Sequence, residues 1–250
     1  MNPAVGTEAP RGLAELWVYL AATPLLGLTL TLLVYHAAFV LYRRSGFHPL
    51  VNPVPPTVLV LATLLWATGT PYATYFEGAQ FVHFLLGPAT VALAVPLFEQ
   101  LHRLRRLALP LLIALTAGAV ATALTAIAVA WLLGATPATL ASFAPKSVTM
   151  PVAMGIAEKI GGLPSLTAVL VMGTGVFGAL VGRYLFDALG IREPAVRGFA
   201  LGTIAHGIGT ARAFQESEES GAFAGLAMGL SALFNAVALP ALAVWLLARL

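Results

Sequence analysis

The feature that most constrains this chain is a series of long, uninterrupted apolar runs. The run from Leu107 to Leu133 holds no charged side chain and is rich in leucine and alanine. It is longer than the roughly 20 apolar residues that a helix needs to cross a bilayer. Only helices and closed barrels satisfy backbone polar groups in lipid, and a barrel strand would alternate polar and apolar residues. We therefore predict an all-α, polytopic transmembrane helical bundle.

The composition excludes several other classes of protein. Charged residues make up 9% of the 250, whereas a soluble domain carries about 25%. The apolar share of 59% excludes disorder. The chain has no cysteine, its histidines lack metal-site spacing, and no phosphate-binding loop or nucleophile motif is present. We expect no enzyme activity, no cofactor and no metal. A net charge of +3 without a long basic run indicates no nucleic-acid partner.

The apolar runs divide residues 1–250 into about seven to eight hydrophobic segments, which we interpret as a single integral membrane domain. They begin near residue 13 and include single runs over about 80–98 and 195–213. The arginines at 43–44 and at 103–106 are expected on the cytoplasmic side, because cytoplasmic loops are enriched in basic residues.

The segment 136–162 differs from the other runs, because Pro145 and Pro151 interrupt it. A full crossing would place the arginines at 192 and 197 outside, against the charge rule. A re-entrant hairpin would place them inside and the acidic loop 215–220 outside. We favour a re-entrant or broken segment.

Lys146 lies between these two prolines, beside Ser147 and Thr149. An ionisable side chain within a membrane segment is costly and is therefore a functional candidate. Broken helices expose unpaired backbone groups, and helix N-termini attract anions. An ammonium group with two hydroxyls at such a break favours a site for a small anion. The alternative is that the Lys146 side chain extends to the interface from a re-entrant tip.

A second constellation occupies residues 202–212. Gly207 and Gly209 predict a helix break there, because glycine permits unusual backbone angles and close contacts. Thr210 would open a half-helix beside Arg212, whose guanidinium matches a carboxylate. His206 is a candidate for proton coupling, because histidine titrates near neutral pH. The alternatives are an interior, hydrogen-bonded His206 and an Arg212 that flanks a helix.

A third break is predicted at Pro88, near Thr90. Residues 87–91 and 144–148 both place a proline inside an apolar run. Paired broken segments are typical of inverted repeats in transporters, so an inverted repeat is one interpretation of this echo.

Several motifs together resemble the LrgB/CidB family, over roughly residues 50–245. They are residues 68–72 (TGTPY), 86–97 (LGPATVALAVPL), 145–149 (PKSVT), 202–212 (GTIAHGIGTAR) and 221–223 (GAF). The resemblance implies a protein of the bacterial cytoplasmic (inner) membrane. One reading of the family is antiholin-like or holin-like, controlling murein hydrolase activity and cell lysis. The other is transport. The C-terminal half of the plastid glycolate/glycerate translocator is similar to this chain, and bacterial relatives are linked to pyruvate uptake with a small LrgA-like membrane partner.

Buried cationic and hydroxyl groups beside helix breaks favour transport, because a holin-like lesion does not require them. We therefore predict a secondary transporter of small monocarboxylates such as pyruvate, lactate, glycolate or glycerate, working by alternating access. Antiholin-like control of lysis is the alternative. The carboxylate would be held by Lys146, Ser147, Thr149, Thr210 and Arg212, with Thr90 and the Pro88 break lining the site. Glycine-rich helix faces, surrounded by membrane lipid, favour a homodimer, and an LrgA-like partner is expected from the resemblance.

Overall fold

The computed structural model describes residues 24–48, 51–92, 94–247 and 249. Every regular element in those ranges is a helix, which confirms the all-α prediction. Four of the described helices are long and apolar enough to cross a membrane: α2 (Pro24–Arg44), α7 (Leu101–Leu132), α10 (Pro164–Ala188) and α12 (Glu218–Leu247). The part of the first predicted run that precedes Pro24 lies outside the described residues.

The chain divides into two compact units, Met1–Thr90 and Val91–Leu250. The single membrane domain predicted from the sequence stays a prediction. In the first unit, α2 packs against α4 (Tyr72–Phe84), because Gly27 has no side chain to overlap the carbonyl oxygen of Tyr75. The hydroxyls of Thr31 and Tyr75 lie 2.7 Å apart across the same contact. Helix α3 (Val54–Thr68) ends at Gly69, whose φ of 63° suits glycine.

The apolar run predicted over residues 80–98 is not one helix. It is divided among α4, α5 (Leu86–Ala92) and α6 (Ala94–Glu99). Pro88 and Pro96 each lie in the first turn of a short helix. The N–H groups of a first turn make no bond within the helix, so a proline is tolerated there. The two similar segments, residues 87–91 and 144–148, differ in structure, because the first is helical and the second is not.

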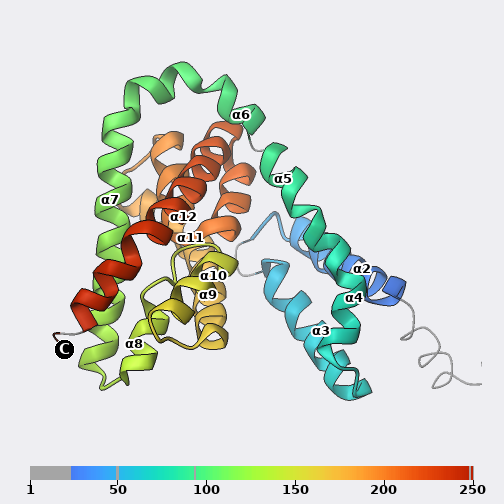
Figure 1. Cartoon of the computed structure of the whole chain (residues 1–250). Helices are drawn as coiled ribbons and strands as arrows, with labels where there is room; N and C mark the ends of the chain where they lie inside the picture. The colour runs from blue at the N-terminus through green and yellow to red at the C-terminus, as the bar shows by residue number, and fades with distance from the viewer. Residues whose placement is uncertain (1–23, 49–50, 93, 248, 250) are drawn as a thin grey trace, which may run out of the picture. The chain divides into compact units, whose positions relative to one another are not determined.

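In the second unit, the three long helices α7, α10 and α12 alternate with two broken segments (Figure 1). We call the first segment hairpin 1. It comprises α8 (Pro137–Phe143), a non-helical tip over residues 144–149, and α9 (Met150–Lys159). After α9 the chain returns to the end of α8, where the Leu163 N–H donates to Ser142 Oγ at 2.8 Å. A methyl group on Gly162 would lie 2.9 Å from the Ser142 nitrogen. Hairpin 1 therefore enters and leaves on one side.

The second broken segment, hairpin 2, is α11 (Pro194–Glu216). Its backbone departs from helical geometry at His206, where φ is 42° and ψ is −134°. A methyl group on Gly209 would lie 2.6 Å from the carbonyl oxygen of Leu201. A straight helix would separate these two residues by about 12 Å. The chain therefore folds back at His206.

The charged residues that flank hairpin 2 support the same reversal. Arg103, in the first turn of α7, forms ion pairs with both Glu193 and Glu219. Glu193 precedes α11 and Glu219 follows it, so the two ends of hairpin 2 lie together. A straight α11 of 23 residues would separate them by roughly 35 Å. The sequence expectation that the acidic loop 215–220 lies opposite the arginines is wrong, because hairpin 2 does not cross.

Hairpin 2 is held closely against α12. A methyl group on Gly198 would overlap the carbonyl of Ser220, and one turn later a methyl on Gly202 would overlap that of Ala224. The first half of α11 therefore runs parallel to α12. Small residues at both positions allow this close approach of two backbones.

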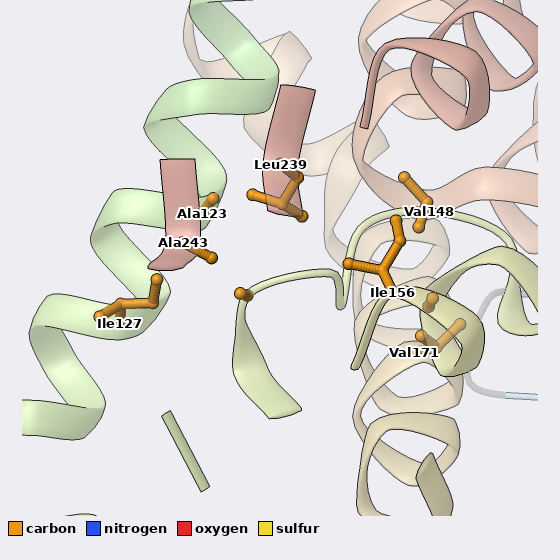
Figure 2. Close-up of a cluster of buried hydrophobic side chains, with 9 residues drawn as sticks. Ala123, Ile127, Val148, Ile156, Val171, Leu239 and Ala243 are labelled. Atoms are coloured by element: carbon orange, nitrogen blue, oxygen red, sulfur yellow. The ribbon is translucent and has the colours of Figure 1, made fainter. Parts of the chain in front are cut away.

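Apolar clusters fill the space on either side of the hairpin tips. One buried cluster joins α7, α12, hairpin 1 and α10, and Figure 2 labels Ala123, Ile127, Val148, Ile156, Val171, Leu239 and Ala243 within it. A second cluster, around Leu115, Phe199 and Phe223, joins the beginning of α12 to α7 and hairpin 2. These clusters fix the long helices against the hairpins.

Candidate binding site at the tips of two hairpins

The tips of both hairpins lie against the same part of α10. The ring Nε2 of His206 is 2.9 Å from the carbonyl oxygen of Val171. The side chain of Val171 belongs to the same buried cluster as Val148, in the tip of hairpin 1 (Figure 2). The structure thus brings together the two sequence breaks that were predicted separately.

The hairpins approach this point from opposite ends of α10. Hairpin 1 contacts the beginning of α10, where the Thr167 hydroxyl donates to the carbonyl of Ser142 at 3.1 Å. Hairpin 2 descends from the other end. A methyl group on Gly182 would lie 2.8 Å from Leu201, and one on Gly178 would lie 2.8 Å from Ala205. Two broken segments that enter from opposite ends have the orientation that an inverted repeat requires.

His206 is held in its unusual backbone conformation by contacts on several sides. A positive φ is unfavourable for a residue with a Cβ and costs about 1–3 kcal/mol. The side chain is buried, and a methyl group on Gly175 would lie 2.6 Å from the ring carbon Cε1. The carbonyl of His206 accepts a bond from Thr210 Oγ1 at 2.9 Å. The break therefore falls on His206 itself, while Gly207 and Gly209 have helical conformations.

The tip of hairpin 1 carries two polar groups that lack protein partners. Ser147 is 7% exposed, and its hydroxyl makes no hydrogen bond to any described residue. Lys146 is half-buried, and nothing in the described part of the chain pairs with its ammonium group. Buried polar groups are nearly always hydrogen-bonded, so the unpartnered Ser147 hydroxyl and the Lys146 ammonium make this tip the candidate site for a polar ligand.

Thr149 and Pro151 begin α9 at the same tip. Thr149 is the N-cap, but its side chain makes no capping bond, and Pro151 lies in the first turn. Pro151 has no N–H, and the Ala153 N–H donates to the Thr149 carbonyl at 2.9 Å, so the Met150 and Val152 N–H groups are the ones that the N-cap leaves without an acceptor. These amides carry partial positive charge, which adds to that of Lys146. Pro145 begins the turn that leads to Ser147, and the carbonyl of Pro145 accepts a bond from the Val148 N–H at 3.2 Å.

Three polar residues near hairpin 2 were not among the predicted site residues. Asn235 Nδ2 donates to the carbonyl of Ser231 at 2.8 Å, and Ser231 Oγ lies 3.4 Å from the carbonyl of Thr203. All three are buried. Ser231 and Asn235 lie four residues apart in the apolar run of α12, so their shared helix face was the signal available in the sequence.

Thr210 and Arg212 lie on the returning half of hairpin 2. Thr210 Oγ1 bonds within the hairpin, to His206, and faces Met228 Sδ at 3.9 Å. Arg212 is buried, and its guanidinium contacts Gln215 Oε1 at 3.1 Å and Glu216 Oε1 at 3.7 Å. Glu216 therefore balances the Arg212 charge at the open end of the hairpin rather than at its tip.

Pro88 and Thr90 belong to the first unit, on α5. The side chain of Thr90 lies outside what the structure describes. The site assembled here consists of second-unit residues alone.

Comparison with known proteins assigns the chain to a family. The sequence model of the LrgB-like family matches residues 31–245. The chain belongs to the LrgB-like family. "Uncharacterized protein YwbG" of Bacillus subtilis (strain 168) is 37% identical over 86% of this chain and 96% of its own length. "Antiholin-like protein LrgB" of Bacillus cereus (strain B4264) is 27% identical over 87% of this chain and 95% of its own. A Haemophilus influenzae protein is 33% identical over 74% of this chain and 80% of its own length. No solved structure matches the chain.

Membership of this family, with four helices able to cross a bilayer, identifies an integral membrane protein. The family prediction made from the five motifs is confirmed. All of those motifs lie within the matched residues, and two of them form the tips of the hairpins.

Proposed function

We propose that this LrgB-family protein is a secondary transporter of small monocarboxylates such as pyruvate, lactate, glycolate and glycerate. One observation carries the proposal. Two hairpins meet at Val171 from opposite ends of α10, and the tip of one holds a free ammonium and an unpartnered, buried hydroxyl. Transporter binding sites occur where broken helices meet within the membrane.

The substrate carboxylate binds at the tip of hairpin 1. Lys146 supplies the charge, Ser147 a hydroxyl donor, and the first turn of α9 its unpaired amides beside Thr149. Helix N-termini of discontinuous helices bind carboxylates in this way. The second half of α11 begins at Gly207, next to His206, so its N-terminus also points into the region between the tips.

Alternating access follows from the way the hairpins enter. Each hairpin separates the tip region from one face of the membrane, so movement of one hairpin opens the site to that face alone. His206 is the proton-coupling residue in this mechanism. Its ring Nε2 bonds the Val171 carbonyl, so a change in the protonation of the ring acts directly on the contact between hairpin 2 and α10. Thr210 stabilises the turn, and Arg212 orients the returning helix through Glu216.

The surroundings of the transporter are part of the proposal. It resides in the bacterial cytoplasmic membrane as a homodimer and works with a small LrgA-like membrane protein. Crosslinking of the purified protein, with and without that partner, tests the assembly.

Uptake of labelled pyruvate and glycolate into proteoliposomes tests the transport proposal. We expect saturable uptake by the wild type and its loss in Lys146→Ala. Lys159→Ala is the matched control, because Lys159 is the other lysine of hairpin 1 and is exposed at the far end of α9. Absence of uptake, with an imposed proton gradient and an LrgA-like partner present, would refute transport. Equal uptake by wild type and Lys146→Ala would remove Lys146 from the site.

The alternative function is antiholin-like control of cell lysis, which the name of the B. cereus relative, antiholin-like protein LrgB, favours. Under this alternative, deletion of the protein changes murein hydrolase release. When the deletion strain is given the Lys146→Ala variant, murein hydrolase release returns to the wild-type level, as it does with the natural sequence. Under the transport proposal, Lys146→Ala fails to restore it.

A further inference from the structure

An apolar groove of about 340 Å³ lies between α7 and the first half of hairpin 2, away from the hairpin tips. Leu107, Leu111 and Gly118 line it from α7, and Val196, Phe199 and Ile204 line it from α11. Thr203 is its one polar lining residue. The Thr203 hydroxyl donates to the carbonyl of Phe199. The methyl carbon Cγ2 of Thr203 faces α7, where a methyl group on Gly118 would lie 3.5 Å from it. The groove wall is therefore apolar along its whole length.

The length of the groove matches one leaflet of a bilayer. Its lining on α7 extends from Leu107 to Gly118, and these two residues lie about 16 Å apart along a helix axis. The hydrocarbon core is about 30 Å thick, so the groove covers half of it. A partner transmembrane helix would need a surface along the full thickness, whereas a lipid acyl chain needs one leaflet.

Two unpaired arginines stand at the polar end of the groove. Arg106 lies one turn before the lining residue Pro110, and Arg192 lies three residues before the lining residue Ala195. Both are exposed, and neither forms an ion pair with any residue that the structure describes. The nearby carboxylates of Glu193 and Glu219 are already paired with Arg103. One guanidinium between two carboxylates leaves one net negative charge, so Arg103, Arg106 and Arg192 together exceed Glu193 and Glu219 by one positive charge.

We infer that this groove binds an anionic phospholipid, with one acyl chain along α7 and α11 and the phosphate between Arg106 and Arg192. Basic residues between transmembrane helices on the cytoplasmic side bind anionic headgroups, and this arginine-rich end is the one that the charge rule places there. The inner end of the acyl chain would contact Thr203 and Ile204, just before His206. Bound lipid thus stabilises hairpin 2, which holds whether or not the protein is a transporter.

Native mass spectrometry of the purified protein tests this inference directly. The protein in detergent is titrated with palmitoyl-oleoyl phosphatidylglycerol or with the matching phosphatidylcholine. We expect phosphatidylglycerol to bind more tightly. Arg106→Gln with Arg192→Gln should weaken it roughly 25-fold, because each basic residue near an anionic surface contributes about 1 kcal/mol, or about fivefold.

Arg105→Gln is the matched control. Arg105 is also exposed and in the same turn of α7, but the helical period places it on the side opposite the lining residues. Equal loss in Arg105→Gln, or no loss in the double variant, would overturn the inference. Ala114→Trp, at an exposed lining position, should reduce binding by filling the groove. If Ala114→Trp instead changes only the oligomeric state, the groove holds a protein helix and the inference is wrong.

Discussion

Hairpin 1 reverses over the non-helical residues 144–149, whereas hairpin 2 reverses at the single residue His206. In hairpin 1 the turn is a local property. Pro145 and Pro151 bracket it, and its backbone bonds close within the turn, from the Lys146 N–H to Phe143 and from the Val148 N–H to Pro145. The two prolines exclude a continuous helix here whatever surrounds the turn.

Hairpin 2 depends on its neighbours instead. The backbone at His206 is strained, and its ring bond to Val171, the glycines of α10 and the close contact with α12 hold it in place. One turn is therefore set by its local sequence, whereas the strain of the other is compensated by contacts with α10 and α12. A membrane protein that must change conformation would move hairpin 2.

The largest expected effect comes from separating hairpin 2 from α12. Gly202→Ala places a methyl group on the Ala224 carbonyl, so we expect a loss of about 3 kcal/mol or more in stability. In hairpin 1, Gly162→Ala meets the Ser142 nitrogen at 2.9 Å and should cost about 1 kcal/mol. Thermal unfolding in detergent measures both.

Gly229→Ala is the control for these variants, because nothing lies within 4 Å of the added methyl on α12. It should leave the melting temperature unchanged or raise it slightly, since alanine favours helix. If Gly202→Ala behaves like Gly229→Ala, the close contact between hairpin 2 and α12 does not exist.

The strain at His206 is tested by comparing two substitutions at that position. His206→Ala keeps the unfavourable φ of 42° and removes the bond to Val171, so we expect a loss of about 2–3 kcal/mol. His206→Gly removes the same bond but relieves the strain and should be about 1 kcal/mol more stable than the alanine variant. The two unfolding curves are compared directly. A glycine variant less stable than the alanine variant would show that the backbone at this position is not strained.

The two hairpins also differ in how far their sequences predict them. The break at hairpin 1 could be predicted, because two prolines within six residues exclude a continuous helix. Hairpin 2 could be recognised only as a glycine-rich irregularity, with a break expected at Gly207 and Gly209. A histidine with positive φ has no local sequence signal, since its conformation is imposed by contacts with α10 and α12.

Charged residues could be located in the sequence, but their ion-pair partners could not. The arginines at 103–106 lie in the first turns of α7, and the partners of Arg103, Glu193 and Glu219, could not be deduced from spacing. Arg212 was predicted to hold a substrate, and the structure places Glu216 beside it, one turn further along. An i,i+4 pair of this kind is visible in a sequence only once the segment is known to be helical.

Two serines of hairpin 1 provide a smaller and sharper test. Ser142 Oγ accepts from the Leu163 N–H and donates to the Ala138 carbonyl, so Ser142→Ala should cost about 1 kcal/mol by removing both bonds. Ser147 has no protein partner, so Ser147→Ala should change stability by less than about 0.5 kcal/mol. Under the proposed function, the same substitution raises the KM for pyruvate uptake severalfold. Loss of stability without a change in KM would assign Ser147 to the fold instead of the site.

A further small effect is expected at the ion pairs at the open end of hairpin 2. The side chains of Arg103, Glu193 and Glu219 are 40%, 51% and 27% exposed, so solvent screens both pairs. Arg103→Gln should therefore lower stability by about 1 kcal/mol at most, and the difference should shrink as salt is added. Arg105→Gln, which breaks no pair among the described residues, controls for the lost charge. A salt-insensitive loss above about 3 kcal/mol would mean that Arg103 itself holds the two ends of α11 together. In that case the reversal at His206 would follow from the ion pairs, and the glycine contacts with α10 and α12 would be secondary.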